Sequence, residues 1–359
     1  MSVAINGFDG SPAPVDVQAT AAAIAANIAR VIEGKPEAIE LGLIALLAEG
    51  HLLIEDIPGV GKTTFAKAIA RSIDCTVRRV QFTPDLMPSD LTGVSVFNSL
   101  TSDFDFKPGP VFANVVIGDE INRASPKTQS ALLECMEERQ VTVDGRTFTL
   151  EAPFFVVATQ NPIDMEGTYP LPEAQRDRFM LRVSMGYPTH NAEIAMLSEH
   201  AAADPMADLG PVCDAETMRR LIRATRDIFV ADSLKAYAVD IAVATRRSPH
   251  VKLGASPRAS LQLLRAAKAR AAVRGRGHVL PDDLQAMTIP VLAHRILLSS
   301  SGAAAGVTTS TLLSTLLNAV PIPTQVNSVN SVNPVNTGGV GALPAARSQT
   351  AGAPDYQVG

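Results

Sequence analysis

The chain has 359 residues, 46% of them hydrophobic and 19% charged, so it can bury a sizeable core and form two domains. Aromatic residues make up 4% and tryptophan is absent, which disfavours an aromatic platform for single-stranded nucleic acid. The net charge of −5 argues against a generally basic nucleic-acid-binding protein, although it leaves a local basic face open.

The cysteines and apolar segments favour a cytoplasmic protein that is not inserted in a membrane. Cys75, Cys135 and Cys213 lie far apart, without CxxC or zinc-ligand spacing, and such sparse cysteine is typical of a reducing compartment. No Lys or Arg precedes Arg30, as a signal peptide would require, and the long uncharged stretch 296–320 is rich in Ser and Thr.

In chain order, the pattern predicts a loose leader, an α/β domain, a helical domain and a tail. Residues 1–15 mix Gly, Pro and Asp without a period, and an alanine-rich helix follows at about 16–32. Up to residue 187, apolar runs alternate with helical patterns, which predicts a parallel sheet covered on both faces. The candidate strands are 51–54, 76–80, 115–117, 154–158 and 179–185.

After residue 187 the strand signals stop. Residues 188–320 are rich in Ala, Leu and Arg, and predict a smaller, all-helical domain. In residues 321–359, Val-Asn recurs every three residues with almost no charge, which predicts a disordered low-complexity tail.

A phosphate-binding loop is predicted at residues 56–64, Asp-Ile-Pro-Gly-Val-Gly-Lys-Thr-Thr, between a candidate strand and a helix. Glycines let backbone N–H groups surround a phosphate, Lys62 neutralises its charge, and Thr63 offers a hydroxyl to Mg²⁺. Asp56 replaces the first Gly of the GxxxxGK[ST] pattern, so an ordinary glycine-rich turn is the alternative. The candidate nucleotide-binding residues are Pro58, Gly59, Val60, Gly61, Lys62, Thr63 and Thr64.

Two further candidate strands are followed by polar residues at their carboxyl ends. Ligands of parallel sheets bind at this end of the strands. Asp119 and Glu120 follow the strand at 115–117, so Asp119 and Thr63 are the candidate Mg²⁺ residues and Glu120 would polarise the attacking water. An Asp-Glu pair can also simply cap the next helix. Asn161 follows the strand at 154–158 and could hold the water or the γ-phosphate, or could be a turn residue before Pro162.

Six motifs follow one another in a fixed order: FKPGP (106–110), DEINRA (119–124), KTQSALLE (127–134), ATQNP (158–162), EGTYPLPEAQ (166–175) and GASPR (254–258). Together they resemble the MoxR-type AAA+ ATPases, over roughly residues 34–323. The resemblance implies an αβα sandwich with a five-stranded parallel sheet, a small helical lid, and ATP with Mg²⁺ between them.

The resemblance also implies roles for individual residues. Lys62 and Thr63 match Walker A, with Asp56 looking tolerated in the family; Asp119 and Glu120 match Walker B, and Asn161 matches sensor 1. Arg178 looks like the arginine finger that one subunit of a ring supplies to the next, although Arg176 lies close by. The resemblance implies that this ring is a hexamer. Arg258 looks like sensor 2, acting on the nucleotide of its own or of the neighbouring subunit.

The residues around both arginines agree with these roles. Arg178 has no obvious acidic partner within reach along the sequence, although a surface salt bridge is the alternative. Arg258 follows Ser256 and Pro257, which are typical of a helix start, where a cation is unfavourable unless it meets an anion such as phosphate.

Two loops could carry output rather than chemistry. Residues 139–150 predict a hairpin with a turn at Asp144-Gly145, and residues 90–110 interrupt an expected helix. In the family these look like the pre-sensor-1 hairpin and the helix-2 insert, which point toward a substrate. Both could equally be inert surface loops.

Three functions remain open. The resemblance favours a chaperone-like ATPase that remodels protein clients, with von Willebrand factor A domain proteins and cofactor or metal insertion as its usual context. A nucleic-acid motor is supported only by basic residues of the helical domain: Arg265, Lys268, Arg270, Arg274 and Arg276. A scaffold that binds ATP without turnover is disfavoured by Glu120 and Arg178. The six histidines show no ligand spacing, and His294-Arg295 receives no function.

Overall fold

The computed structural model describes residues 15–162, 168–188, 190, 193–194 and 206–323. The chain divides into a compact unit, Met1–Val326, and a second unit, Asn327–Gly359. Nearly all of the predicted leader and tail, and the second unit as a whole, lie outside the described residues.

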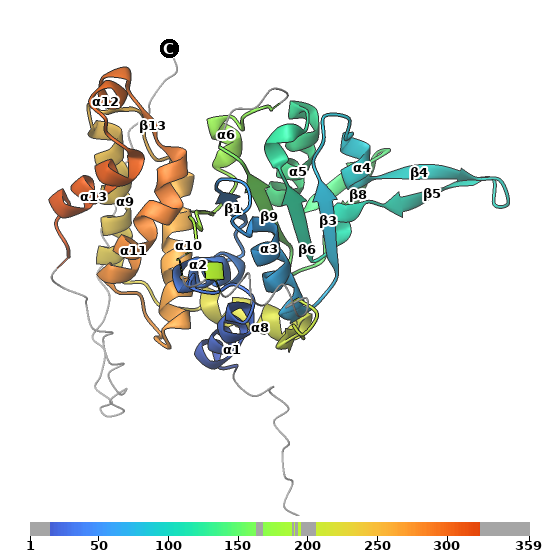
Figure 1. The fold of residues 1–359 in the computed structure, drawn as a ribbon, viewed down its shortest axis with the longest axis horizontal. Coiled ribbons are helices and arrows are strands. Elements are labelled where there is room, and N and C mark those ends of the chain that lie inside the picture. The colour runs from blue at the N-terminus through green and yellow to red at the C-terminus, as the bar shows by residue number, and fades with distance from the viewer. Residues whose placement is uncertain (1–14, 163–167, 189, 191–192, 195–205, 324–359) are drawn as a thin grey trace, which may run out of the picture. The chain divides into compact units, whose positions relative to one another are not determined.

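A five-stranded parallel sheet forms the centre of the first unit, in the strand order β10-β1-β9-β6-β3 (Figure 1). The strands are β1 Leu52–Glu55, β3 Val77–Gln81, β6 Val115–Asp119, β9 Phe155–Gln160 and β10 Leu181–Val183. The predicted sheet is therefore confirmed, because each strand overlaps one of the five candidate segments. β6 and β9 are buried along their whole length, as parallel strands covered on both faces should be.

Helices cover both faces of the sheet. Successive side chains of a strand point to opposite faces, so neighbouring residues of one strand contact different helices. Leu52 and Ile54 of β1 join one apolar cluster with α1, α2, α3 and α8, while Leu53 joins a second cluster with α4 and α5. These helices, with the short α6, are α1 Val17–Ala29, α2 Pro36–Leu47, α3 Lys62–Arg71, α4 Pro88–Thr92, α5 Pro126–Glu138, α6 Glu173–Arg176 and α8 Ala215–Arg226.

The C-terminal part of this unit is a helical lid, as predicted. Its elements are α9 Asp232–Arg247, α10 Pro257–Val273, α11 Pro281–Leu292, the 3-10 turn η3 Ala293–Arg295, α12 Ser300–Ala304 and α13 Thr309–Ala319. The lid also contains two short antiparallel strands, β12 Val251–Leu253 and β13 Leu297–Leu298, whereas the sequence predicted only helices in this region. A further two-residue strand, β11 Cys213–Asp214, pairs with β2 Ile73–Asp74 of the core.

Two hairpins extend from the core. The predicted one is β7 Gln140–Val143 and β8 Arg146–Thr149, where Asp144 and Gly145 both have positive φ angles, as a two-residue hairpin turn needs. The segment that interrupts the expected helix is a second hairpin, β4 Gly93–Asn98 and β5 Asp103–Pro108, which projects from the body of the unit (Figure 1). Phe106 of β5 stacks on Phe148 of β8, with ring centroids 4.3 Å apart, so the hairpins contact each other.

No helix among the described residues is both long enough and apolar enough to span a bilayer.

Candidate nucleotide site

The phosphate-binding loop joins β1 to α3 at the carboxyl end of the sheet. Gly59 and Gly61 have φ angles of +82° and +85°, a region that disfavours residues with a side chain. α3 begins at Lys62, so its unpaired N–H groups and its positive dipole end face this loop. The ammonium group of Lys62 donates to the backbone carbonyls of Asp56 and, at 3.0 Å, Ile57. Desolvation lowers the pKa of Lys62, although the nearby carboxylates oppose the shift.

Asp56, which occupies the place of the first Gly of the motif, anchors the loop to the edge strand. Its Oδ2 accepts hydrogen bonds from Ser184 Oγ at 2.8 Å and Gly186 N at 2.6 Å, beyond the end of β10, and its Oδ1 accepts one from Ile57 N at 2.8 Å. Burial would raise the pKa of Asp56, but these hydrogen bonds lower it below its ordinary value. The departure from the motif therefore supplies an anchor, which local sequence pattern does not indicate.

Asp119, at the end of β6, lies directly beside the phosphate-binding loop. Its Oδ1 accepts hydrogen bonds from Thr63 Oγ1 at 2.8 Å and Thr159 Oγ1 at 3.3 Å, and its Oδ2 pairs with Arg79 Nε of β3 at 2.6 Å. The structure thus brings together the two predicted Mg²⁺ residues, Thr63 and Asp119. Hard oxygen donors of this kind suit Mg²⁺, and the metal would compete with Arg79 for the carboxylate.

Glu120 follows Asp119 in a left-handed backbone conformation, with φ at +56°. Its N–H donates to Thr159 Oγ1 at 3.0 Å, and its carboxylate accepts bonds from Arg123 at 2.8 Å and Gln81 at 3.2 Å. A non-glycine residue with positive φ is uncommon and is often found at functional sites. The predicted base therefore lies beside Asp119, but its carboxylate is paired with neighbouring side chains.

Asn161 lies at the same edge, directly after β9. Its carbonyl accepts a hydrogen bond from Asn122 Nδ2 at 3.1 Å. Asn122 is buried, and its Oδ1 has no hydrogen-bond partner within the part of the chain that the structure describes. The sequence predicted Asn161 from the strand end, and missed Asn122, Thr159 and Arg79 because their partners are distant in the chain.

A cavity of about 830 Å³ opens beside the loop, between the core and the lid. Its lining comes from the start of α2, the loop residues Asp56 and Ile57, the end of β10 including Arg182, and α11 of the lid, including Ile289 and Pro290. This volume is within the usual range for small-molecule sites. The α2 and lid residues were missed from the sequence because nothing local marks them.

Arg178 and Arg258 lie together at the amino ends of the strands, which is the edge of the sheet opposite to the phosphate-binding loop. Arg178 precedes β10, and its Nε pairs at 2.8 Å with Glu137 Oε2 near the end of α5, while Arg258 pairs with Glu137 Oε1. Ser256 caps α10 and Pro257 is its first residue, as predicted, but the anion that meets Arg258 here is a carboxylate. Desolvation would raise the pKa of Glu137, and the two arginines lower it below its ordinary value.

The separation of the two clusters follows from the parallel sheet. Lys62 and Asp119 follow the carboxyl ends of β1 and β6, whereas Arg178 precedes β10, which runs parallel to β1. Four residues of strand span roughly 13 Å. Arg258 is also not among the residues lining the cavity beside the loop.

The basic lid residues do not form an open cationic face. Arg270 and Arg276 both pair with the buried carboxylate of Asp283, and Arg274 pairs with Glu40 of α2. Two others bind main-chain oxygens: Arg265 those of Ala48 and Glu49, and Lys268 that of Arg226. These contacts explain the basic residues as structural and weaken the case for a nucleic-acid motor.

Comparison with known proteins agrees with this arrangement. The profile of the ATPase family associated with various cellular activities (AAA) matches residues 51–181, and that of the AAA lid domain matches residues 243–316. The two profiles thus cover the sheet with its phosphate-binding loop and most of the lid, and they place the chain in the AAA class.

Relatives along most of the chain narrow this class. Chaperone MoxR1 of Mycobacterium tuberculosis is 41% identical over 84% of this chain and 82% of its own length. The uncharacterised protein YeaC of Bacillus subtilis is 48% identical over 84% of this chain and 95% of its own. A crystal structure from Cytophaga hutchinsonii, described as that of a candidate ATPase, superposes with a TM-score of 0.79 at 35% identity and covers 86% of this chain and 96% of that one. The chain belongs to the MoxR-type AAA+ ATPase family.

Proposed function

We propose that the protein hydrolyses ATP with Mg²⁺ at the edge that carries Lys62, Thr63, Asp119 and Glu120. The observation that carries this proposal is the 2.8 Å bond from Thr63 Oγ1 to Asp119 Oδ1, which joins the phosphate-binding loop to the acidic strand end. Gly59 and Gly61 leave open backbone for phosphate oxygens, since a Cβ at either position would meet no atom within 4 Å. The donor set therefore fits a magnesium-bound triphosphate.

The residues of this edge have separable tasks. Bound MgATP supplies the γ-phosphorus for attack by water and the metal charge that offsets the phosphates. Lys62 exchanges its two carbonyl partners for phosphate oxygens, while Thr63 and Asp119 hold the metal shell. Glu120 breaks its hydrogen bonds with Arg123 and Gln81, orients the attacking water and accepts its proton. Asn161 has the sensor 1 role that its position after β9 suggests.

We propose further that Arg178 and Arg258 serve the nucleotide of a neighbouring subunit. Both meet at Glu137, at the edge opposite to their own phosphate-binding loop, which favours action on the nucleotide of another subunit. Placement of this edge against the loop of the next subunit produces a ring, and we propose a hexamer. An arginine supplied in trans accelerates phosphoryl transfer about 10³- to 10⁵-fold.

The output of hydrolysis is proposed to be the remodelling of a protein client, since one close relative is named a chaperone. The β4–β5 hairpin supports this, because Phe97, Leu100 and Phe104 are 56%, 95% and 58% exposed near its tip. A von Willebrand factor A domain protein is our proposed partner class. Binding of such a domain in the presence of ATP, lost in a Leu100→Asp variant that still hydrolyses ATP, would support this step.

Mixed assemblies test the hydrolysis proposal. Lys62→Ala removes nucleotide binding and leaves Arg178 intact, while Arg178→Ala does the reverse, so each variant alone should be inactive. Mixtures should recover activity at interfaces that join an intact loop to an intact arginine. Absence of recovery, in mixtures shown to co-assemble, would contradict the proposed role in trans.

Glu120→Gln tests the chemical step itself. The amide cannot accept the proton of water, so hydrolysis should fall about 10²- to 10⁴-fold while ATP binding persists. Phosphate release measures the first quantity and calorimetric titration the second. Unchanged turnover would exclude Glu120 as the base.

A further inference from the structure

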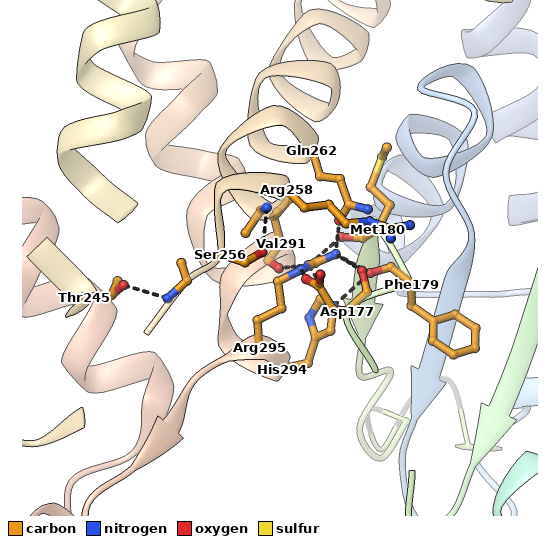
Figure 2. Close-up of polar contacts among 12 residues, drawn as sticks. Asp177, Phe179, Met180, Thr245, Ser256, Arg258, Gln262, Val291, His294 and Arg295 are labelled. Carbon is orange, nitrogen blue, oxygen red and sulfur yellow. Dashed lines mark hydrogen bonds and ion pairs between the residues drawn. The ribbon is translucent and has the colours of Figure 1, made fainter. Parts of the chain in front are cut away.

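Arg295 is a buried arginine of the lid that the nucleotide site does not use. It ends the 3-10 turn η3, and its residue is 4% exposed. Its Nε pairs with Asp177 Oδ1 at 2.6 Å, and one terminal nitrogen donates to Asp177 O at 3.0 Å and Phe179 O at 2.5 Å. The other terminal nitrogen donates to Met180 O at 3.2 Å. Figure 2 shows the guanidinium of Arg295 pointing into this segment of the core.

The backbone that Arg295 holds lies on both sides of Arg178. Asp177 precedes Arg178, and Phe179 and Met180 follow it, so three carbonyls around this residue accept from a single guanidinium. The side chain of Arg178 itself pairs with Glu137. The main chain on both sides of Arg178 is therefore held by the guanidinium of Arg295, together with His294 Nε2, which lies 3.0 Å from Phe179 O.

The same guanidinium also reaches the helix that carries Arg258. It donates to Gln262 Oε1, and Gln262 lies four residues after Arg258 in α10, one helical turn further on. The turn before Arg258 is fixed as well, because Ala255 N donates to Thr245 Oγ1 at 2.9 Å. A Cβ at Gly254 would lie 2.8 Å from the backbone of Arg246, so the chain approaches α9 closely there. Arg178 and Arg258 are thus connected through the core and the lid to one buried side chain.

The surroundings keep Arg295 charged. Burial lowers the pKa of Arg295 to about 10, while Asp177 opposes the shift, so the guanidinium remains protonated at neutral pH. The neighbouring His294 is buried, and desolvation together with the charge of Arg295 lowers its pKa well below the ordinary value. A neutral imidazole beside the guanidinium avoids a second buried cation.

We propose that Arg295 is a positioning residue for the two arginines of the subunit interface: through Asp177, the carbonyls around Arg178, and Gln262, it holds Arg178 and Arg258 in one arrangement for the neighbouring nucleotide. This inference rests on the proposed action of Arg178 in trans. If Arg295 has this role, the orientation of Arg178 depends on how the lid packs on the core.

Arg295→Lys tests the inference, because lysine keeps the charge and loses the planar fork of donors. The variant should bind ATP with unchanged affinity, since its own phosphate-binding loop is intact. Its kcat should fall about 10²-fold, the scale expected for a misplaced catalytic group, with little change in KM. Loss of ATP binding together with activity would indicate a folding role and would overturn the inference.

Mixed assemblies separate positioning from folding. Arg295→Lys subunits should recover activity when mixed with Lys62→Ala subunits, which supply intact arginines. They should not recover with Arg178→Ala subunits, because both partners would then lack a working arginine finger. Recovery with Arg178→Ala, or none with Lys62→Ala, would contradict the inference.

Two controls make the result decisive. The mixture of Arg178→Ala and Lys62→Ala subunits is assayed alongside. If this mixture recovers no activity, the action of Arg178 in trans is refuted. If it recovers activity but the mixture of Arg295→Lys and Lys62→Ala does not, only the role of Arg295 is refuted. Arg274→Lys is the matched variant, since Arg274 also joins the lid to a core carboxylate, Glu40, without contacting the Arg178 segment. It should keep full activity.

A milder variant covers the case in which Arg295→Lys does not fold. Asp177→Asn removes only the ion pair and leaves the carbonyl contacts of Arg295 in place. It should lower kcat about tenfold and give the same pattern of recovery in mixtures, whereas full activity of Asp177→Asn would then refute the proposal.

Discussion

The carboxyl edge of the sheet, where the parallel strands end, and the amino edge, where they begin, differ in how their charged side chains are held. At the carboxyl edge, Asp119 is 2% exposed and receives bonds from three side chains, so its position is fixed before any ligand arrives. At the amino edge, Arg178 and Arg258 share the single carboxylate of Glu137, and all three side chains are about one-third exposed. The first edge is preorganised, while at the second edge both arginines are paired with a carboxylate that a phosphate of another subunit could replace.

The largest effect that sharpens this comparison should come from the arginines themselves. Arg178→Ala should lower the kcat of the assembled protein about 10³-fold or more, because the lost charge acts at the transition state. ATP binding should not change, because the carboxyl edge is intact. Steady-state phosphate release and a binding titration measure the two quantities.

Arg176→Ala is the matched control for that variant. Arg176 lies two residues earlier, at the end of α6, and pairs weakly with Glu173 at 3.7 Å. Its removal should lower kcat less than tenfold if Arg178 is the arginine finger. A larger loss in Arg176→Ala than in Arg178→Ala would reverse the assignment.

The sequence predicted the carboxyl edge well because its residues lie in short motifs at strand ends. Lys62 and Thr63 follow β1, Asp119 and Glu120 end or follow β6, and Asn161 follows β9, so a correct parallel sheet brings all of them together. Their roles in catalysis stay predictions, but their proximity followed from local pattern and topology.

The amino edge could be predicted only in part. Motifs indicated Arg178 and Arg258, yet their shared partner Glu137 lies 41 and 121 residues away in the chain, and nothing in its local sequence marks it. Arg295 lies within the predicted helical domain and receives no role from the sequence, because a buried arginine looks the same in sequence as an exposed one. Such contacts depend on how the lid packs on the core, which local periodicity does not encode.

A second pair of arginines that share one carboxylate allows the amino edge to be tested for stability. Asp283 is 0% exposed and pairs with Arg270 and Arg276, whereas the side chain of Glu137 is 34% exposed. Asp283→Asn should therefore lower the free energy of unfolding by about 3 kcal/mol, because it leaves buried charge uncompensated. Glu137→Gln should cost less than about 1 kcal/mol, as is usual for exposed pairs.

Denaturant titration of both variants measures this difference. A small effect at Glu137 would agree with arginines that are held loosely and are free to change partner. A loss at Glu137 as large as that at Asp283 would mean that the arginines are structural, which would count against their action on a neighbouring nucleotide.

The last prediction concerns the pH dependence of stability, and it arises from His51, directly before β1 at the amino edge. His51 is buried; its Nδ1 accepts a hydrogen bond from Val156 N at 3.0 Å and its Nε2 lies 3.1 Å from Met136 O. Desolvation lowers its pKa from 6.5 to about 4. Between these values the unfolded chain binds a proton that the folded chain does not, so stability is complete above pH 6.5 and falls as the pH drops toward 4.

His51→Gln should make this loss less steep. One such group accounts for up to about 3 kcal/mol over the whole window, and His294 adds a loss of the same sign. The variant should be less stable than the wild type at pH 7, where it loses hydrogen bonding, yet the free energy of unfolding should fall less between pH 6.5 and 5. The matched control is His278→Gln, which makes the same substitution at an exposed position. An identical slope in His51→Gln and the wild type would show that protonation of His51 does not control the acid stability of the core.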